Sequence, residues 1–170
     1  MAEEIRLALE TGRLLNQQKL WVVTADSCTG GLLGHLITNV AGSSGYYLGG
    51  LIAYSNAAKE RWLGVAPATI ETYGAVSEET VLEMARGARA AFSDQLDPDR
   101  VIGIAISGIA GPGGGTPEKP VGTVWIGLSA CEKDTAECFH FKGIRASVKN
   151  QSALQALKML NACLSHSKTG

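Results

Sequence analysis

Two serines, a tyrosine and a lysine lie in one short stretch, and these residue types could together hydrolyse an amide or an ester. Residues 41–59 read AGSSGYYLGGLIAYSNAAK, with Ser43 and Ser44 before an apolar run and Tyr54 and Lys59 after it. A serine hydroxyl becomes an effective nucleophile only when a neighbouring base accepts its proton. A lysine can be that base when burial lowers its pKa toward neutrality, and a tyrosine between the two could relay the proton.

The same stretch also fits an ordinary turn, a packed tyrosine and a solvated lysine. The three histidines, His35, His140 and His166, show no partner pattern, and no G-x-S-x-G nucleophile turn occurs. The spacing of Tyr54 and Lys59 also differs from the Y-x-x-x-K motif of short-chain dehydrogenases. Spacing alone therefore leaves both the catalytic and the purely structural interpretation open.

A first glycine-containing turn is a candidate for binding an anionic group. The residues DSCTGG, at 26–31, stand where an apolar strand passes into a helical pattern, with Thr29 as a candidate N-cap. Helix N-termini bind phosphates and carboxylates, and Ser27 and Thr29 would add hydroxyl donors. A capped helix with a tight turn would have the same sequence, so both interpretations remain.

A second glycine-rich segment, SGIAGPGGGTPEKPVGT at 107–123, has the character of a loop over a ligand. A strand follows it rather than a helix, which excludes a dinucleotide fingerprint, and no G-K-[ST] of a phosphate-binding P-loop occurs. A plain connection between two strands is rarely so long and so rich in glycine. Lys119 either lies over the bound ligand or is solvated.

The length of 170 residues predicts a single domain over residues 1–170. The early predicted strands are separated by helices and the late ones by loops. This order predicts a three-layer α/β/α domain with a mixed sheet. The predicted strands are 20–25, 47–54, 101–107, 121–130 and 137–141, and the main predicted helices are 3–18, 29–40, 78–92 and 146–165, with Ser55 and Ser77 as caps of helices that follow them.

Composition excludes several classes of function. The formal net charge of −1 supplies neither a basic surface for nucleic acid nor a polybasic patch for a membrane. No apolar run approaches the roughly 18 residues of a membrane helix, and the acidic N-terminal segment does not have the pattern of a signal peptide. The cysteines and histidines are scattered, so we expect no metal, reduced thiols and a cytoplasmic protein. The cysteines are Cys28, Cys131, Cys138 and Cys163.

Taken together, the motifs resemble those of a known family. The segments ADSCTGG, AGSSGYYLGGLIAYSNAAK, LGV, YGAVSEE, SGIAGPGGGTPEKPVGTVWIG and FKGIR follow one another in the order found in the CinA C-terminal domain family. The resemblance extends from about residue 5 to residue 165. Members of that family are bacterial nicotinamide mononucleotide deamidases. The resemblance therefore implies hydrolysis of the substrate carboxamide to nicotinate mononucleotide and ammonia, without a cofactor.

The resemblance also implies roles for individual residues. It maps a nucleophile onto Ser44, although the adjacent Ser43 stays open, a base onto Lys59 and a proton-holding phenol onto Tyr54. Apart from the resemblance, backbone oxyanion donors are expected near Ser44 or in the 108–111 loop. The substrate phosphate is expected at the DSCTGG turn, with Thr29 and Arg145 as its contacts. Residues expected to contact the substrate are Ser27, Thr29, Gly30, Gly31, Ser107, Gly108, Gly111 and Arg145.

Two positions depart from the family pattern and keep alternative functions open. Asp26 replaces the usual glutamate, and Ile144 replaces the usual acidic residue before Arg145. A catalytically weak paralogue that acts as a nucleotide-binding module is one alternative, and an interaction domain that binds no nucleotide is another. The resemblance further implies self-association as a homodimer or a higher homo-oligomer, with a small-molecule nucleotide as the other partner.

Overall fold

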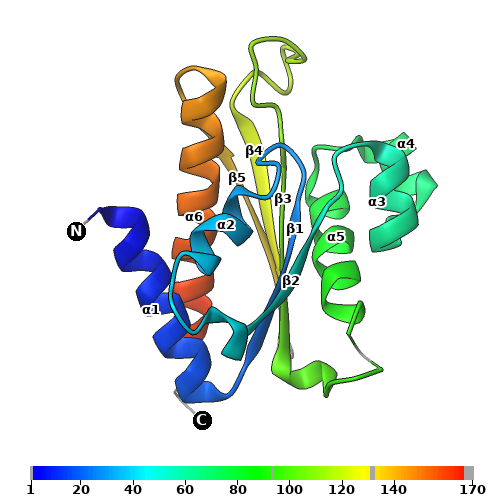
Figure 1. Ribbon diagram of the computed structural model, residues 1–170. Coiled ribbons are helices and arrows are strands. Elements are labelled where there is room, and N and C mark those ends of the chain that lie inside the picture. Colours follow the sequence, from blue (N-terminus) through cyan, green and yellow to red (C-terminus); the bar gives the residue numbers. More distant parts are fainter. Residues whose placement is uncertain (1, 93, 131–132, 167–170) are drawn as a thin grey trace.

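The computed structural model describes residues 2–92, 94–130 and 133–166, and its elements follow the predicted α/β order (Figure 1). Short 3₁₀ turns precede two of the strands, at Ser43–Gly45 and Pro98–Arg100. The helices are α1 (Glu3–Gln18), α2 (Leu32–Thr38), α3 (Asn56–Leu63), α4 (Pro67–Tyr73), α5 (Glu78–Ala90) and α6 (Arg145–His166). The strands are β1 (Trp21–Asp26), β2 (Tyr47–Ile52), β3 (Val101–Gly108), β4 (Thr123–Ser129) and β5 (Asp134–His140).

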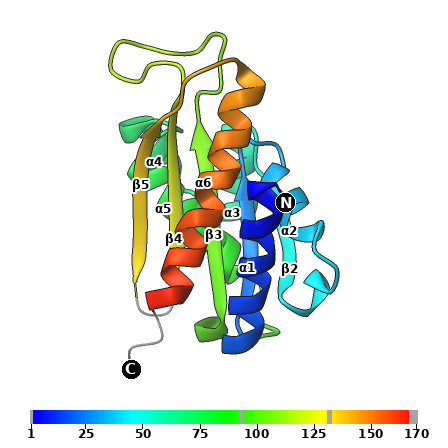
Figure 2. The same cartoon turned by 90° about the vertical axis from the view of Figure 1, so that its left-hand side faces the viewer.

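The five strands form one mixed sheet in the order β2-β1-β3-β4-β5. β1 lies between β2 and β3 and is parallel to both, whereas β4 and β5 are added as antiparallel strands. Helices α1, α2 and α6 cover one face, and α3, α4 and α5 cover the other, as the two views show (Figures 1 and 2). The prediction of three layers around a mixed sheet is confirmed.

Two apolar clusters lie on either side of the sheet and hold the layers together. Between the sheet and α1, α2 and α6, the buried side chains include Leu15, Ile104 and Leu157. On the other face α5 packs closely, because Gly103 in β3 leaves room for its backbone. A Cβ at Gly103 would lie 2.0 Å from the carbonyl oxygen of Ala85, so no larger residue fits there without moving α5.

Local capping signals fixed two of the helix starts as predicted. The Ser55 hydroxyl accepts a hydrogen bond from the Ala58 N–H over 3.1 Å, and the Ser77 hydroxyl accepts one from the Thr80 N–H over 3.2 Å. The predicted cap at Thr29 is wrong. The cap position of α2 is Gly31, in the left-handed region at φ 91°, where glycine is favoured.

The parallel strands bring three chain segments to one edge of the sheet. Asp26 is paired with Ile52 of β2 and with Ile106 of β3, so β1 and β2 end at the same level and β3 extends two residues beyond them. Ligands of open α/β sheets bind at this carboxyl edge, where the strand order reverses. In Figure 1 it is the upper edge, beside the long loop between β3 and β4 and the start of α6.

Within the described ranges, no helix combines the length and the apolar character that a membrane crossing requires.

Candidate active site

A serine and a lysine meet in the interior at the carboxyl edge of the sheet. Ser27 follows the last residue of β1, and Lys59 lies in α3, which follows β2. The Lys59 Nζ atom is 3.0 Å from the Ser27 Oγ atom. Both residues are buried, with 2% of Lys59 and 7% of Ser27 exposed. A proton can therefore pass directly between the two side chains without a bridging water.

Burial disfavours the charged form of Lys59. Besides Ser27, its Nζ atom donates to two backbone carbonyls, those of Ala53 at 3.1 Å and Tyr54 at 3.3 Å. No carboxylate in the described part of the chain forms an ion pair with it. Burial lowers the pKa of Lys59 below its ordinary value. A neutral Lys59 would keep both carbonyl bonds and turn its lone pair toward the Ser27 hydroxyl.

The position of Lys59 within α3 explains why its side chain is buried. The helix is eight residues long, begins at the Ser55 cap and ends at Gly64, which is in the left-handed region at φ 66°. Lys59 and Leu63 are its buried residues, and positions four apart lie on the same helix face. Lys59 thus lies with Leu63 on the buried face of this helix, where its side chain loses most of its hydration.

Tyr54 and Arg145 form a second polar group at the rim of the same pocket. The Arg145 guanidinium donates to the Tyr54 phenolic oxygen and to the Gly111 carbonyl oxygen, each over 2.6 Å. Tyr54 therefore touches Lys59 through its carbonyl, while its phenol is held by Arg145 at the surface. The predicted Arg145 lies at the pocket, and the exposed Ile144 before it leaves both of its hydrogen bonds intact.

The structure does not bring Ser44 or Ser43 to Lys59. Both lie in the 3₁₀ turn before β2, at the edge of the sheet opposite to the one where Ser27 and Lys59 meet. β2 has six residues, and a strand rises about 3.3 Å per residue, so roughly 20 Å separate its two ends. The parallel register of β1 and β2 therefore places Ser27, rather than Ser44, beside the lysine.

The glycine-rich loop is fastened to the segment between α4 and α5. The Lys119 ammonium donates to the carbonyl oxygens of Tyr73 at 2.7 Å and Val76 at 2.8 Å. The Ser107 hydroxyl donates to the Ala75 carbonyl oxygen over 2.7 Å. The half-buried Lys119 thus anchors the glycine-rich loop to the segment that forms one wall of the pocket.

Asp26 organises the turn that carries Ser27. It is 1% exposed, and its carboxylate accepts hydrogen bonds from the Thr29 hydroxyl and the Leu33 N–H. Burial raises the pKa of Asp26, and these hydrogen bonds partly offset the effect. The Thr29 hydroxyl is therefore engaged within the turn. The shorter Asp26 side chain still reaches the donors that shape the turn.

Cys28 lies beside the serine but does not have the properties of a nucleophile. It is buried, and burial together with the nearby Asp26 raises the pKa of its thiol to about 11. A thiol rather than a thiolate is therefore present at neutral pH. Cys131, also counted among the expected reduced thiols, lies outside the described residues.

Ser27, Lys59, Tyr54 and Arg145 line one pocket, which has a volume of about 220 Å³. Sequence reasoning had singled out Ser27, Tyr54, Lys59 and Arg145 from its lining, together with Ser107 and Gly108. It had not identified Asn56, and it had assigned no role to Cys28. The lining residues are Ser27, Cys28, Tyr54, Asn56, Lys59, Ala75, Val76, Ser107, Gly108, Ala110 and Arg145.

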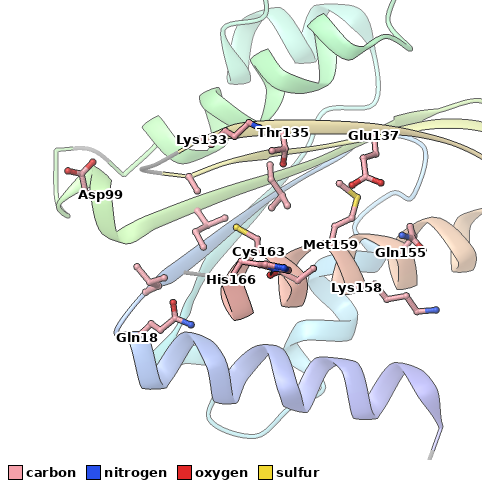
Figure 3. Close-up of a pocket in the computed structure, with 15 residues that line it drawn as sticks. Gln18, Asp99, Lys133, Thr135, Glu137, Gln155, Lys158, Met159, Cys163 and His166 are labelled. Carbon is pink, nitrogen blue, oxygen red and sulfur yellow. Dashed lines mark hydrogen bonds between the residues drawn. The ribbon is translucent and has the colours of Figure 1, made fainter. Parts of the chain in front are cut away.

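A larger cavity of about 930 Å³ lies elsewhere, where α6 passes over β4 and β5 (Figure 3). Its lining includes Ile102, at the start of β3, and Leu128, near the end of β4. Those positions belong to the edge opposite the carboxyl ends of β1 and β3. The Ser27–Lys59 pair is not part of this cavity, so the smaller pocket is the candidate active site.

The described residues contain no group of three or more histidine, cysteine, aspartate or glutamate side chains that could hold a metal ion.

Fold and site define a class: a three-layer α/β protein with a buried serine–lysine pair where three parallel strands end. The chain belongs to the CinA C-terminal domain family, whose model matches residues 4–164. Among similar proteins is one from Enterobacter agglomerans named "Nicotinamide-nucleotide amidohydrolase PncC". It is 45% identical, over 89% of this chain and 90% of its own length.

Other relatives carry less specific names. A "Putative competence-damage inducible protein" of Moorella thermoacetica is 47% identical over 88% of this chain, which spans only 35% of that relative. Among solved structures, the competence damage-inducible protein A of Klebsiella pneumoniae superposes with a TM-score of 0.89 at 33% identity, covering 96% of this chain and 98% of that one. The fold and the family are thus shared with relatives of different lengths.

Proposed function

We propose that the protein hydrolyses the carboxamide of nicotinamide mononucleotide, with Ser27 as the nucleophile and Lys59 as the base. The observation that carries this proposal is the 3.0 Å distance between the buried Lys59 Nζ atom and the Ser27 Oγ atom. The choice of substrate rests on the name of the Enterobacter agglomerans relative, which this chain matches over nearly the whole of both lengths.

The reaction would proceed through an acyl-enzyme. Neutral Lys59 accepts the Ser27 proton while the serine oxygen attacks the carboxamide carbon, giving a tetrahedral oxyanion. The carbon–nitrogen bond then breaks, and the leaving nitrogen takes the proton from Lys59 and departs as ammonia. Water, deprotonated by the same lysine, hydrolyses the ester and releases nicotinate mononucleotide and the Ser27 hydroxyl.

In this scheme the N–H groups that stabilise the oxyanion must lie beside Ser27. Donors must lie about 3 Å from the developing negative oxygen, so they have to come from backbone that surrounds the reacting carbon. The turn after β1 and the loop after β3 lie at that edge of the sheet, whereas the turn at Ser43–Gly45 lies at the other edge. We therefore assign the oxyanion donors to the turn or the loop.

The test combines product analysis with a covalent trap. Purified protein is incubated with nicotinamide mononucleotide, and ammonia and nicotinate mononucleotide are measured in equal amounts over time. Rapid acid quenching followed by peptide mass spectrometry should find the nicotinoyl mononucleotide ester on the peptide that carries Ser27. Binding of the nucleotide without any release of ammonia would instead support a nucleotide-binding module, and an ester on another residue would displace Ser27.

A further inference from the structure

A second cavity adjoins the candidate active site and has the character of an anion site. It measures about 360 Å³ and is lined by Thr29, Gly30, Gly31, Leu32, His35, Ala146, Lys149 and Asn150. No carboxylate stands among these residues. Sequence reasoning had assigned phosphate binding to Thr29 and Arg145, but both side chains are held by internal hydrogen bonds.

Two chain segments pass from the active-site pocket directly into this cavity. Cys28 lines the pocket and Thr29, the next residue, lines the cavity; Arg145 and Ala146 are related in the same way. Both hollows are therefore lined by the same two chain segments, at neighbouring residues whose Cα atoms are about 3.8 Å apart. A molecule with its amide at Ser27 would extend along the turn and the start of α6 into the second hollow.

Lys149 supplies the positive charge of this cavity. It lies four residues after Arg145 on α6, and residues four apart share a helix face. Its Nζ atom is 3.8 Å from the position that a Cβ on Gly30 would occupy. Among the described residues, no side chain forms a hydrogen bond or ion pair with this ammonium.

Gly30 and Gly31 line the cavity without side chains, and the Gly30 N–H donates to the Ser27 carbonyl oxygen within the turn. Gly30 and Gly31 have φ values of 64° and 91°, a region that side-chain-bearing residues rarely adopt. Asp26, the carboxylate of this turn, does not line the cavity and is 1% exposed, because Thr29 and Leu33 donate to it from the turn itself. An anion could thus approach the turn and the lysine without a facing carboxylate.

We infer that this cavity binds the 5′-phosphate of the nucleotide substrate, with the Lys149 ammonium as its counter-charge. The inference rests on the proposed amidase function, because that function places the carboxamide at Ser27. The ribose would bridge the two hollows along Thr29 and Ala146. Lys149 would then decide between a nucleotide and a nucleoside, whereas Ser27 and Lys59 perform the same chemistry on either.

The experiment compares nicotinamide mononucleotide with nicotinamide riboside, which lacks the phosphate. Lys149→Met should raise KM for the nucleotide by about 10- to 100-fold, the range of one hydrogen bond to a charged group, with little change in kcat. KM for the riboside should stay the same. Lys149→Arg should restore part of the preference for the nucleotide. Lys158→Met removes the same charge from the same helix and should leave both substrates unaffected.

A binding measurement separates this inference from the proposed function. In calorimetry on the Ser27→Ala variant, nicotinamide mononucleotide should bind more tightly than the riboside, and adding Lys149→Met should abolish that difference. This result would support the phosphate site even if no ammonia were released by the unmutated protein. An unchanged preference for the nucleotide after Lys149→Met, with a melting temperature equal to that of the parent, would overturn the inference.

Discussion

Arg145 and Tyr54 are joined by a hydrogen bond of 2.6 Å between guanidinium and phenolic oxygen, although 91 residues separate them in the chain. The contact links the start of α6 to the segment that follows β2. Because the Tyr54 carbonyl also accepts a hydrogen bond from Lys59, the position of this segment affects the proposed catalytic base. Arg145 is therefore a positioning residue for the pocket.

Replacing Arg145 by methionine should lower kcat by about 10- to 100-fold, since displacement of a catalytic group by about 1 Å has an effect of that size. The bonds to Tyr54 and Gly111 are both lost, while Ser27 and Lys59 remain. Ammonia release under saturating substrate measures the effect. Arg13→Met, on the exposed side of α1, is the matched control and should behave as the parent protein.

Ile144→Asp should change kcat by less than about threefold. Ile144 is 77% exposed, and Arg145 already has two oxygen acceptors, so an added surface carboxylate contributes little to its orientation. Steady-state kinetics of the variant and parent check this directly. A tenfold rise in kcat would show that Arg145 is held too loosely in the native protein.

Ser27→Ala should lower kcat by at least about a thousandfold, as removal of a nucleophile does in other hydrolases. Ser44→Ala should keep more than half of the activity, because Ser44 lies at the other edge of the sheet. Circular dichroism and melting temperature establish that both variants fold. Retained activity in Ser27→Ala together with its loss in Ser44→Ala would reverse the assignment.

Lys59→Arg should be nearly inactive, because a guanidinium does not release its proton at accessible pH. Lys59→Met should be equally inactive but at least as stable as Lys59→Arg, since the site is 2% exposed and a neutral side chain avoids burying a charge. Urea unfolding supplies the stability comparison. Substantial activity in Lys59→Arg would mean that the lysine acts only through its charge.

The pH dependence of kcat/KM should show a rising limb that belongs to Lys59. Burial lowers the pKa of this amine from its ordinary 10.5. As pH rises, Lys59 therefore reaches its active neutral form before pH 10.5. Activity should therefore rise as pH increases and level off before 10.5. A limb centred at or above that value would contradict a desolvated base.

The free energy of unfolding should also depend on the ionisation of Lys59, and it should rise with pH. Between the lowered pKa of Lys59 and 10.5, the unfolded chain binds more protons than the folded one, so the free energy of unfolding rises with pH. Cys28 acts in the opposite direction between 9.0 and about 11, where the folded protein keeps the thiol proton. Comparing Lys59→Met with its parent, both in a Cys28→Ala background, isolates the lysine.

Local patterns were sufficient to predict the layers and most element boundaries. Alternating and continuous apolar runs identified the strands, and Ser55 and Ser77 marked two helix starts because their hydroxyls cap free N–H groups. The pairing of Ser44 with Lys59 was not obtainable in this way. Proximity along the chain suggested it, but a strand between two residues separates them in space.

The site itself depended on the register of the sheet. Ser27 and Lys59 are 32 residues apart, and they meet because β1 and β2 are parallel neighbours whose ends are level. One signal was present in the sequence: a serine directly after one buried strand and a lysine soon after the next. Reading the ends of parallel strands together, rather than each stretch alone, would have identified the pair.

The single guanidinium of Arg145 serves both the loop at Gly111 and the phenol of Tyr54. Displacing the loop would free one guanidinium nitrogen, and displacing the phenol would free the other, so either change leaves Arg145 with a single one of these two partners to fix its position. The position of the loop at Gly111 and the orientation of the Tyr54 phenol are therefore coupled through Arg145. Coupling between two binding equilibria is reciprocal. A ligand that contacts Tyr54 would bias the loop toward one arrangement, and closure of the loop would, by the same amount, favour that ligand.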